Sequence, residues 1–171
     1  RCLVGSEMCI RDRFLSEPEV KKYPVESGEF EFTVILDQAG FVSFTYREQT
    51  LDLFLKPGDN LKMKFNEAEV VKSVSFSGTA AIENQFLLGF MNKFSQHFDR
   101  EALLDTMPYL SVDGLEIMLY DQMSAHAKYF EESPVSKHFS SQFQHYLKNL
   151  SEYHYNDGIL AYATENNAGK R

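Results

Sequence analysis

The spacing of apolar residues changes near Gly78, and this change constrains the fold more than any other feature of the chain. Before Gly78, apolar and polar residues alternate, which is the period of a half-buried strand. After Gly78, apolar residues recur every three or four positions, which is the period of an amphipathic helix. Several strands in a row without an intervening helix favour an antiparallel sheet or sandwich. The sequence therefore predicts an α+β chain, with an antiparallel β-sheet or sandwich-like N-terminal half and an α-helical C-terminal half.

Five segments carry the alternating pattern: GEFEFTVIL, FVSFTYR, TLDLFLK, NLKMKF and VKSVSFSG. In the first of them, every second residue from Phe30 to Leu36 is apolar. KPGD predicts a type II turn, because Pro57 presets φ at the second position and Gly58 supplies the positive φ of the third. DQAG, which ends at Gly40, predicts a second turn. We expect about five strands joined by short connections.

Residues 82–94 and 115–130 show the helical period, and the apolar face of the second segment includes His126. Thr79 is the predicted N-cap of the first helix. A short helical turn, DREALLDTM, lies between the two helices and ends before Pro108.

A third helix is predicted further along the chain. Ser133 followed by Pro134 is typical of an N-cap with proline in the first helical position. The helical period continues from there through Tyr153. Long amphipathic helices of this kind must pack on one another or on the sheet to bury their apolar faces.

The first residues, RCLVGSEMCIRDR, hold both cysteines of the chain, Cys2 and Cys9. Their codons resemble a transposase sequencing adapter translated in frame. Charged residues break every apolar run, so the segment lacks the core of a secretory signal. We expect residues 1–13 to be an artefact with no part in the fold. The predicted organisation is then a β-rich domain at 14–78 and a helical region or connector at 79–171.

Charge and composition exclude several classes of function. The chain carries a net charge of −8 and has no Lys/Arg cluster, so we expect neither a nucleic acid nor an anionic membrane as partner. No apolar run reaches about 18 residues, so no membrane span is predicted. Beyond residue 13 there is no cysteine, which excludes a disulfide, a thiolate nucleophile and a Cys-ligated zinc there.

The histidines invite a metal site, but their spacing argues against one. His138 and His145 are seven residues apart, which places them on the order of 10 Å apart along a helix. Zinc ligands must converge to about 2.1 Å from one point. We therefore predict no metal and no cofactor, and surface or helix-face positions for the five histidines: His97, His126, His138, His145 and His154.

Other catalytic motifs are missing as well. The serines of SFSGT lack the Gly-x-Ser-x-Gly elbow, and KPGDN lacks the lysine of a phosphate loop. Acidic pairs such as Asp52 with Asp59 are typical of solvated surface. A hydrolase that combines a histidine with Asp99 or Asp121 is a third alternative without any local signature. We expect no catalytic residues.

The segment LFLKPGDNLKMKFNEAEVVKSVSFSGTAAIENQFL resembles the N-terminal accessory domain of TlpA-type, thioredoxin-like thiol:disulfide reductases from the envelope of Bacteroidetes-type bacteria. The upstream Gly28, Phe30 and Phe32 resemble the family's Gly-x-Phe-x-Phe strand. The resemblance covers approximately residues 26–95, and the motif is structural rather than catalytic. Its residues in this chain are Phe54, Leu55, Pro57, Gly58, Asp59, Phe76, Ser77, Gly78 and Asn84.

In that family, the chemistry belongs to a C-terminal thioredoxin domain with a Cys-x-x-Cys pair, which this chain lacks. The resemblance therefore implies a fragment: a non-catalytic accessory domain that supports or positions a missing redox domain in the periplasm or cell envelope. A client protein would be a further partner. The alternative is a stand-alone binding or interaction module for an apolar ligand or a partner protein.

Overall fold

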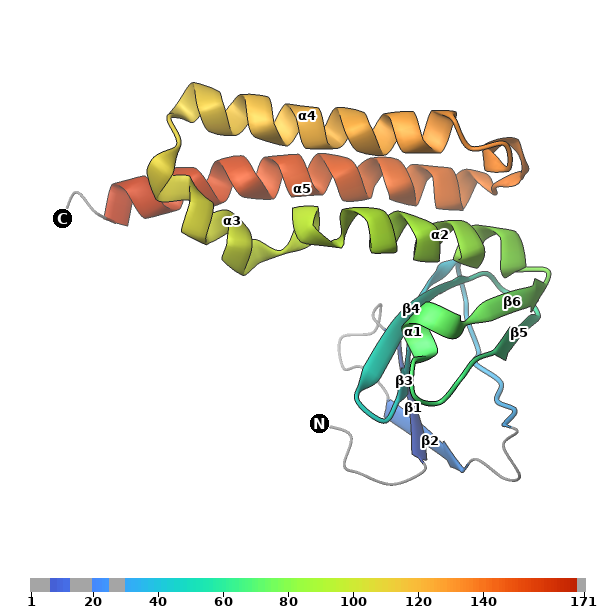
Figure 1. Ribbon diagram of the computed structural model, residues 1–171. Coiled ribbons are helices and arrows are strands. Elements are labelled where there is room, and N and C mark those ends of the chain that lie inside the picture. Colours follow the sequence, from blue (N-terminus) through green and yellow to red (C-terminus); the bar gives the residue numbers. More distant parts are fainter. Residues whose placement is uncertain (1–6, 13–19, 25–29, 169–171) are drawn as a thin grey trace. The chain divides into compact units, whose positions relative to one another are not determined.

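The computed structural model describes residues 7–12, 20–24 and 30–168 (Figure 1). The chain divides into two compact units, Arg1–Leu88 and Gly89–Arg171, which are called the β unit and the helical unit below. The described strands all lie in the β unit, and the long helices follow them. This confirms the predicted α+β class, with antiparallel sheets before helices.

The β unit contains two antiparallel sheets. The larger has the strand order β2-β1-β3-β4, and the smaller pairs β5 with β6. Val42 lies opposite Leu53 in the larger sheet, and Met63 lies opposite Phe76 in the smaller. The strands are β1 (Glu7–Asp12), β2 (Val20–Pro24), β3 (Gly40–Tyr46), β4 (Gln49–Leu55), β5 (Leu61–Lys64) and β6 (Ser75–Gly78).

The expectation that residues 1–13 take no part in the fold is wrong for β1. This strand lies between β2 and β3, with Cys9 opposite Lys22 on one side and Thr45 on the other. Strand pairing uses backbone N–H and C=O groups, so a segment of any origin can complete a ladder if its backbone is extended. The remaining residues of this segment lie outside the described residues.

The first predicted strand is also wrong. Residues 30–36 form no strand, although their burial alternates as expected. Phe30, Phe32, Val34 and Leu36 pack against the core of the β unit, whereas Ile35 is 86 % exposed. An extended backbone gives period-two burial by itself, without the hydrogen bonds of a ladder. Gly28, the first residue of the predicted Gly-x-Phe-x-Phe strand, lies outside the described residues.

A short helix interrupts the last predicted strand. α1 (Val70–Ser73) precedes β6, so VKSVSFSG is part helix and part strand. Val70 and Val74 are both buried, and their spacing of four residues suits one helical turn. The other three predicted strands are confirmed as β3, β4 and β5.

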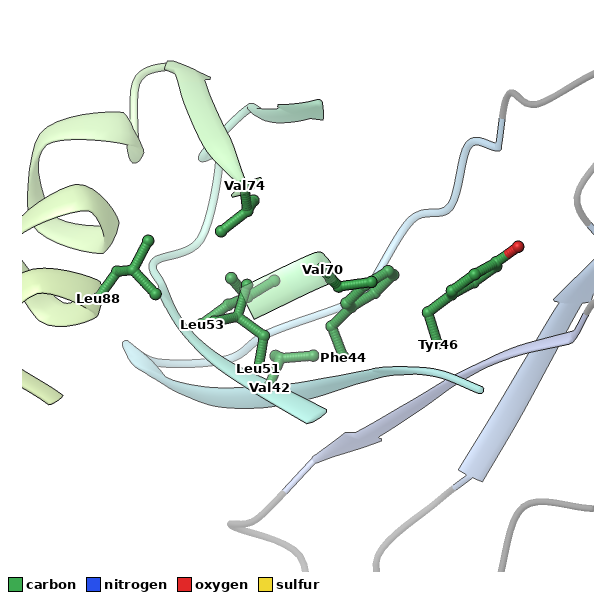
Figure 2. Packing of buried hydrophobic residues seen from close by; sticks show 8 residues of the cluster. All are labelled: Val42, Phe44, Tyr46, Leu51, Leu53, Val70, Val74 and Leu88. Atoms are coloured by element: carbon green, nitrogen blue, oxygen red, sulfur yellow. The ribbon is translucent and has the colours of Figure 1, made fainter. Parts of the chain in front are cut away.

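The core of the β unit is apolar. Figure 2 shows side chains gathered from β3, β4, α1, the residue between α1 and β6, and α2. Burying each large apolar side chain contributes about 1.5–3 kcal/mol. The cluster consists of Val42, Phe44, Tyr46, Leu51, Leu53, Val70, Val74 and Leu88.

Four α-helices follow, with short 3-10 segments between them. α4 and α5 lie side by side within the helical unit (Figure 1). None of the described helices has the length and apolar character needed to cross a membrane. The elements are α2 (Ala81–Phe94), η1 (Ser95–Phe98), α3 (Arg100–Thr106), η2 (Met107–Tyr109), α4 (Val112–Glu131), η3 (Ser136–His138) and α5 (Ser141–Ala168).

Serine and aspartate side chains begin these helices, but two predicted caps are wrong. Asp99 caps α3 and Ser111 caps α4. Thr79 lies two residues before α2, which begins at Ala81, and its hydroxyl instead accepts from the Asn60 N–H at 2.8 Å and donates to Asp59.

The third helix begins later than predicted. After Ser133, the chain forms the 3-10 turn η3, because the Ser133 carbonyl accepts from both the backbone and the hydroxyl of Ser136. Phe139 is then extended and buried. α5 begins at Ser141, and the hydroxyl of Ser140 accepts from the Phe143 N–H at 3.3 Å.

α4 and α5 approach closely at Gly158. A Cβ at this position would lie 2.7 Å from Leu119 Cδ1, so only glycine allows the contact without a shift. Leu119 and Leu115 are fully buried in the same cluster as Met107 and Ala161. This packing fixes the two long helices against each other.

Candidate functional site

The KPGD residues form the turn that connects β4 to β5. Gly58 has φ +83°, and the Asp59 N–H donates to the Lys56 carbonyl at 3.0 Å, which confirms the predicted type II turn. The Asp59 carboxylate also accepts from the Lys56 N–H at 2.9 Å. Pro57 and Gly58 therefore set backbone geometry, and Asp59 stabilises it.

Asn84 lies on α2 and binds the edge of β4. Its side chain is 2 % exposed. Oδ1 accepts from the Phe54 N–H at 2.8 Å, while Nδ2 donates to the Phe54 and Ala80 carbonyls, each at 2.8 Å. Asn84 thus provides the hydrogen bonds that a neighbouring strand would provide at Phe54.

Gly78 ends β6 with φ +105°, and a Cβ there would lie 2.3 Å from the Asn60 carbonyl oxygen. Leu55 and Phe76 pack on the apolar core of the β unit, and Ser77 lies in β6 opposite Lys62. The motif residues thus lie on β4, the turn between β4 and β5, β6 and α2, where they fix the backbone and bury apolar surface.

A histidine cluster occupies the interior of the helical unit. His97 comes from η1, His126 from α4 and His154 from α5. His126 is 2 % exposed, and its ring lies against Phe94, stacked on Phe98 with a centroid distance of 5.1 Å. Three elements therefore bring together imidazoles that are far apart in sequence.

A chain of hydrogen bonds orients the central imidazole. The Ser151 hydroxyl donates to the Leu147 carbonyl, so it accepts from His126 Nδ1 at 3.1 Å. His126 Nε2 then carries a lone pair and accepts from His97 Nδ1 at 2.9 Å. This arrangement leaves His97 Nε2 as an acceptor. His154 Nε2 donates separately to Gln122 Oε1 at 2.7 Å.

The environment favours neutral imidazoles. Burial, together with the smaller effect of the neighbouring His97 and His154, lowers the pKa of His126 to about 4. Burial also lowers the pKa of His97 and of His154, although Asp157 partly offsets the effect at His154. A second positive charge inside this cluster would meet both desolvation and like-charge repulsion.

His97 and Gln122 also line an open groove beside α4. The groove has a volume of about 470 Å³. Its remaining lining residues are Gly114, Ile117, Met118, Asp121 and Ala125, all from α4. The histidine cluster therefore lies beneath a surface depression within the helical unit.

The described residues of the cluster do not form a catalytic triad. Ser151 is buried and its hydroxyl proton is directed to Leu147, so it is not placed as a nucleophile. The Asp99 carboxylate caps α3, and Asp121 is exposed in the groove. Neither carboxylate orients a described histidine through a hydrogen bond, as a catalytic triad requires.

The arrangement also offers no metal centre. Among the described residues, no three or more His, Cys, Asp or Glu side chains are grouped so that they could hold a metal ion. His138 and His145 are exposed, as expected for surface histidines. His126 lies on the inner helix face as predicted, but its contacts with His97 and His154 were not foreseen. Their sequence spacing gives no sign of the contact.

Comparisons with known protein families, with curated proteins and with solved structures find no match to this chain.

Proposed function

We propose that this chain is a non-catalytic accessory module of an envelope thiol:disulfide reductase of the thioredoxin-like, TlpA type. In this proposal the module supports or positions a redox domain in the periplasm or cell envelope. The module is assigned no thiol redox step of its own, because residues 14–171 contain no cysteine, and it is assigned no cofactor. A client protein of the reductase would be a further partner.

The observation that carries the proposal is the bond between Asn84 and Phe54. These two residues belong to the motif that resembles the reductase family, and two hydrogen bonds of 2.8 Å between them hold α2 at the edge of β4. Lys56 and Glu83 form a second tie between the same two segments. Such a connection holds a helix at a defined place on a sheet, which suits a positioning module.

The first test is to sequence the source DNA past Arg171 and upstream of Phe14. We expect the reading frame to continue into a βαβ pattern with a Cys-x-x-Cys pair. A stop codon directly after Arg171 would overturn the accessory-module assignment.

The second test measures insulin disulfide reduction by that longer chain. Asn84→Ala should lower its activity, whereas the exposed Asn92→Ala on the same helix should not. Equal activity of both variants would contradict a positioning role. A chain with Cys2→Ser and Cys9→Ser controls for thiols in the first residues.

The alternative is a stand-alone binding module, and the open groove beside α4 favours it. An open groove suits a partner protein better than a small apolar ligand, because such ligands are usually enclosed by the protein. A stop codon after Arg171 together with partner binding at this groove would support the alternative.

A further inference from the structure

Two neighbouring grooves run along the outer face of α4. The second has a volume of about 310 Å³ and lies beside the groove described above, since Ile117 lines both. Its other lining residues are Asp113, Glu116, Tyr120 and Tyr155. From Asp113 to Asp121, eight residues of helix rise about 12 Å, which matches roughly two turns of a partner helix.

α4 is apolar on its outer face as well as on its inner one. Leu115 and Leu119 are fully buried, whereas Ile117 is 62 % and Tyr120 is 59 % exposed. A solvated helix face is normally polar, so large apolar residues within a groove indicate a contact surface. Isoleucine and tyrosine at i and i+3 provide adjacent apolar contacts for such a surface.

Carboxylates border this apolar surface. Asp113, Glu116 and Asp121 line the grooves, and none of them forms an ion pair with another described residue. Glu116 accepts one hydrogen bond, from the Tyr155 hydroxyl at 3.3 Å. The grooves therefore combine apolar contact area with uncompensated negative charge.

This negative charge distinguishes between the possible binding partners of the grooves. In a two-fold dimer the same patch faces itself, so a second copy would bring these carboxylates together. A chain with a net charge of −8 also repels nucleic acids and anionic lipid surfaces. A positively charged segment with an apolar face satisfies both features of the grooves.

We propose that the two grooves along α4 dock a basic amphipathic helix of a partner protein. Its apolar residues pack on Ile117 and Tyr120, and its Lys or Arg side chains pair with Glu116 and Asp121. His97 lines the same surface. This inference does not depend on the reductase assignment.

The test uses the full chain and a fluorescein-labelled 14-residue peptide of Leu and Lys arranged as an amphipathic helix. Fluorescence anisotropy measures binding at about 0.15 M ionic strength, where the Debye length is roughly 8 Å. Two control peptides are a charge-reversed Leu/Glu helix and a scrambled peptide of the same Leu/Lys composition. We expect saturable binding of the Leu/Lys helix, and at least about tenfold weaker binding of both controls.

Variants locate the binding surface. Glu116→Gln with Asp121→Asn should weaken binding about tenfold. Glu131→Gln with Glu165→Gln is the matched control, because it removes the same charge from exposed positions outside the grooves. Ile117→Ser should also weaken binding about tenfold, and circular dichroism checks that each variant is folded.

Several outcomes would overturn the proposal. Equal loss in the two double variants would mean unspecific attraction to an acidic protein. Binding of the Leu/Glu helix with equal affinity would contradict the charge argument. Sedimentation showing a dimer that Ile117→Ser dissociates would make a second copy the occupant. Displacement of the peptide by free arginine at equal concentration would indicate a site for small cations.

Discussion

The β unit and the helical unit fill their interiors differently. The core cluster of the β unit consists entirely of apolar and aromatic side chains. The buried polar residues of this unit outside that cluster are the neutral Ser43 and Asn84 and the ionisable Glu83, which pairs with Lys56. The helical unit instead buries the titratable side chain of His126, between Phe94 and Phe98. Acid between pH 7.5 and pH 5 should therefore act more strongly on the helical unit, which buries an imidazole, than on the apolar core cluster of the β unit.

The sign of this effect follows from the lowered pKa of His126. The unfolded chain binds a proton near the ordinary value of about 6.5, whereas the folded chain binds it only near pH 4. Between these values the unfolded state holds more protons, so stability falls as the pH falls. The contribution is fully present above about pH 6.5 and is lost progressively toward pH 4. His97 and His154 shift in the same direction.

The largest expected effect comes from the apolar core of the β unit. Phe44→Ala removes a fully buried ring and should lower the free energy of unfolding by about 3–5 kcal/mol. The loss should be the same at pH 7.5 and pH 5, because the buried core cluster contains no titratable residue other than Tyr46. Urea unfolding measures it, and Ile35→Ala at an exposed position is the control. A loss below 1 kcal/mol would contradict the assigned core.

The second effect is acid destabilisation through His126. Between pH 7.5 and pH 5 the free energy of unfolding should fall by about 2 kcal/mol more in the natural chain than in His126→Gln, which does not titrate. Urea unfolding at the two pH values measures the difference. The exposed His145→Gln is the matched control and should behave like the natural chain. If all three proteins respond equally, the buried histidine is not the cause.

The third effect concerns the hydrogen bonds between Asn84 and Phe54 in the β unit. Asn84→Ala leaves the N–H and C=O of Phe54 without their side-chain partner and should lower the free energy of unfolding by about 1–2 kcal/mol. Thermal unfolding should show this loss at any pH from 5 to 7.5, since no titration is involved. Asn92→Ala, exposed on the same helix, should change little. A loss of stability seen only at low pH would be inconsistent with hydrogen bonds between neutral groups.

The smallest effects should come from exposed ion pairs, one in each unit. Glu67→Gln breaks the pair with Arg47, and Arg100→Gln breaks the pair with Asp157, both formed at 2.8 Å. Each change should lower the free energy of unfolding by less than about 1 kcal/mol because the charges are solvated. Chemical denaturation at low and high salt measures the loss of stability in each variant. If one variant loses clearly more stability than this, surface charge also distinguishes the β unit from the helical unit.

Local patterns predicted much of the β unit. Alternation located β3, β4 and β5, and the Pro57-Gly58 pair identified the type II turn. The same alternation failed at residues 30–36, because extended backbone alone produces it. The role of β1 was missed, since pairing through the backbone does not depend on which side chains a strand carries.

The candidate site was much harder to predict. The helical period placed His126 on an inner face, but its partners lie on η1 and α5. Such contacts depend on how three helices pack, and the spacing of the histidines in sequence does not encode that. The grooves along α4 were missed for a related reason, because Ile117 and Tyr120 lie off the predicted apolar face.

Hydrogen exchange followed by mass spectrometry at pH 7 and pH 5 compares both units within one chain. After correction for the intrinsic exchange rates, amides of α4 and α5 should lose about 2 kcal/mol of protection at pH 5, whereas those of β3 and β4 keep theirs. Equal loss in both units, or a loss confined to β3 and β4, would contradict acid destabilisation through the buried histidine of the helical unit.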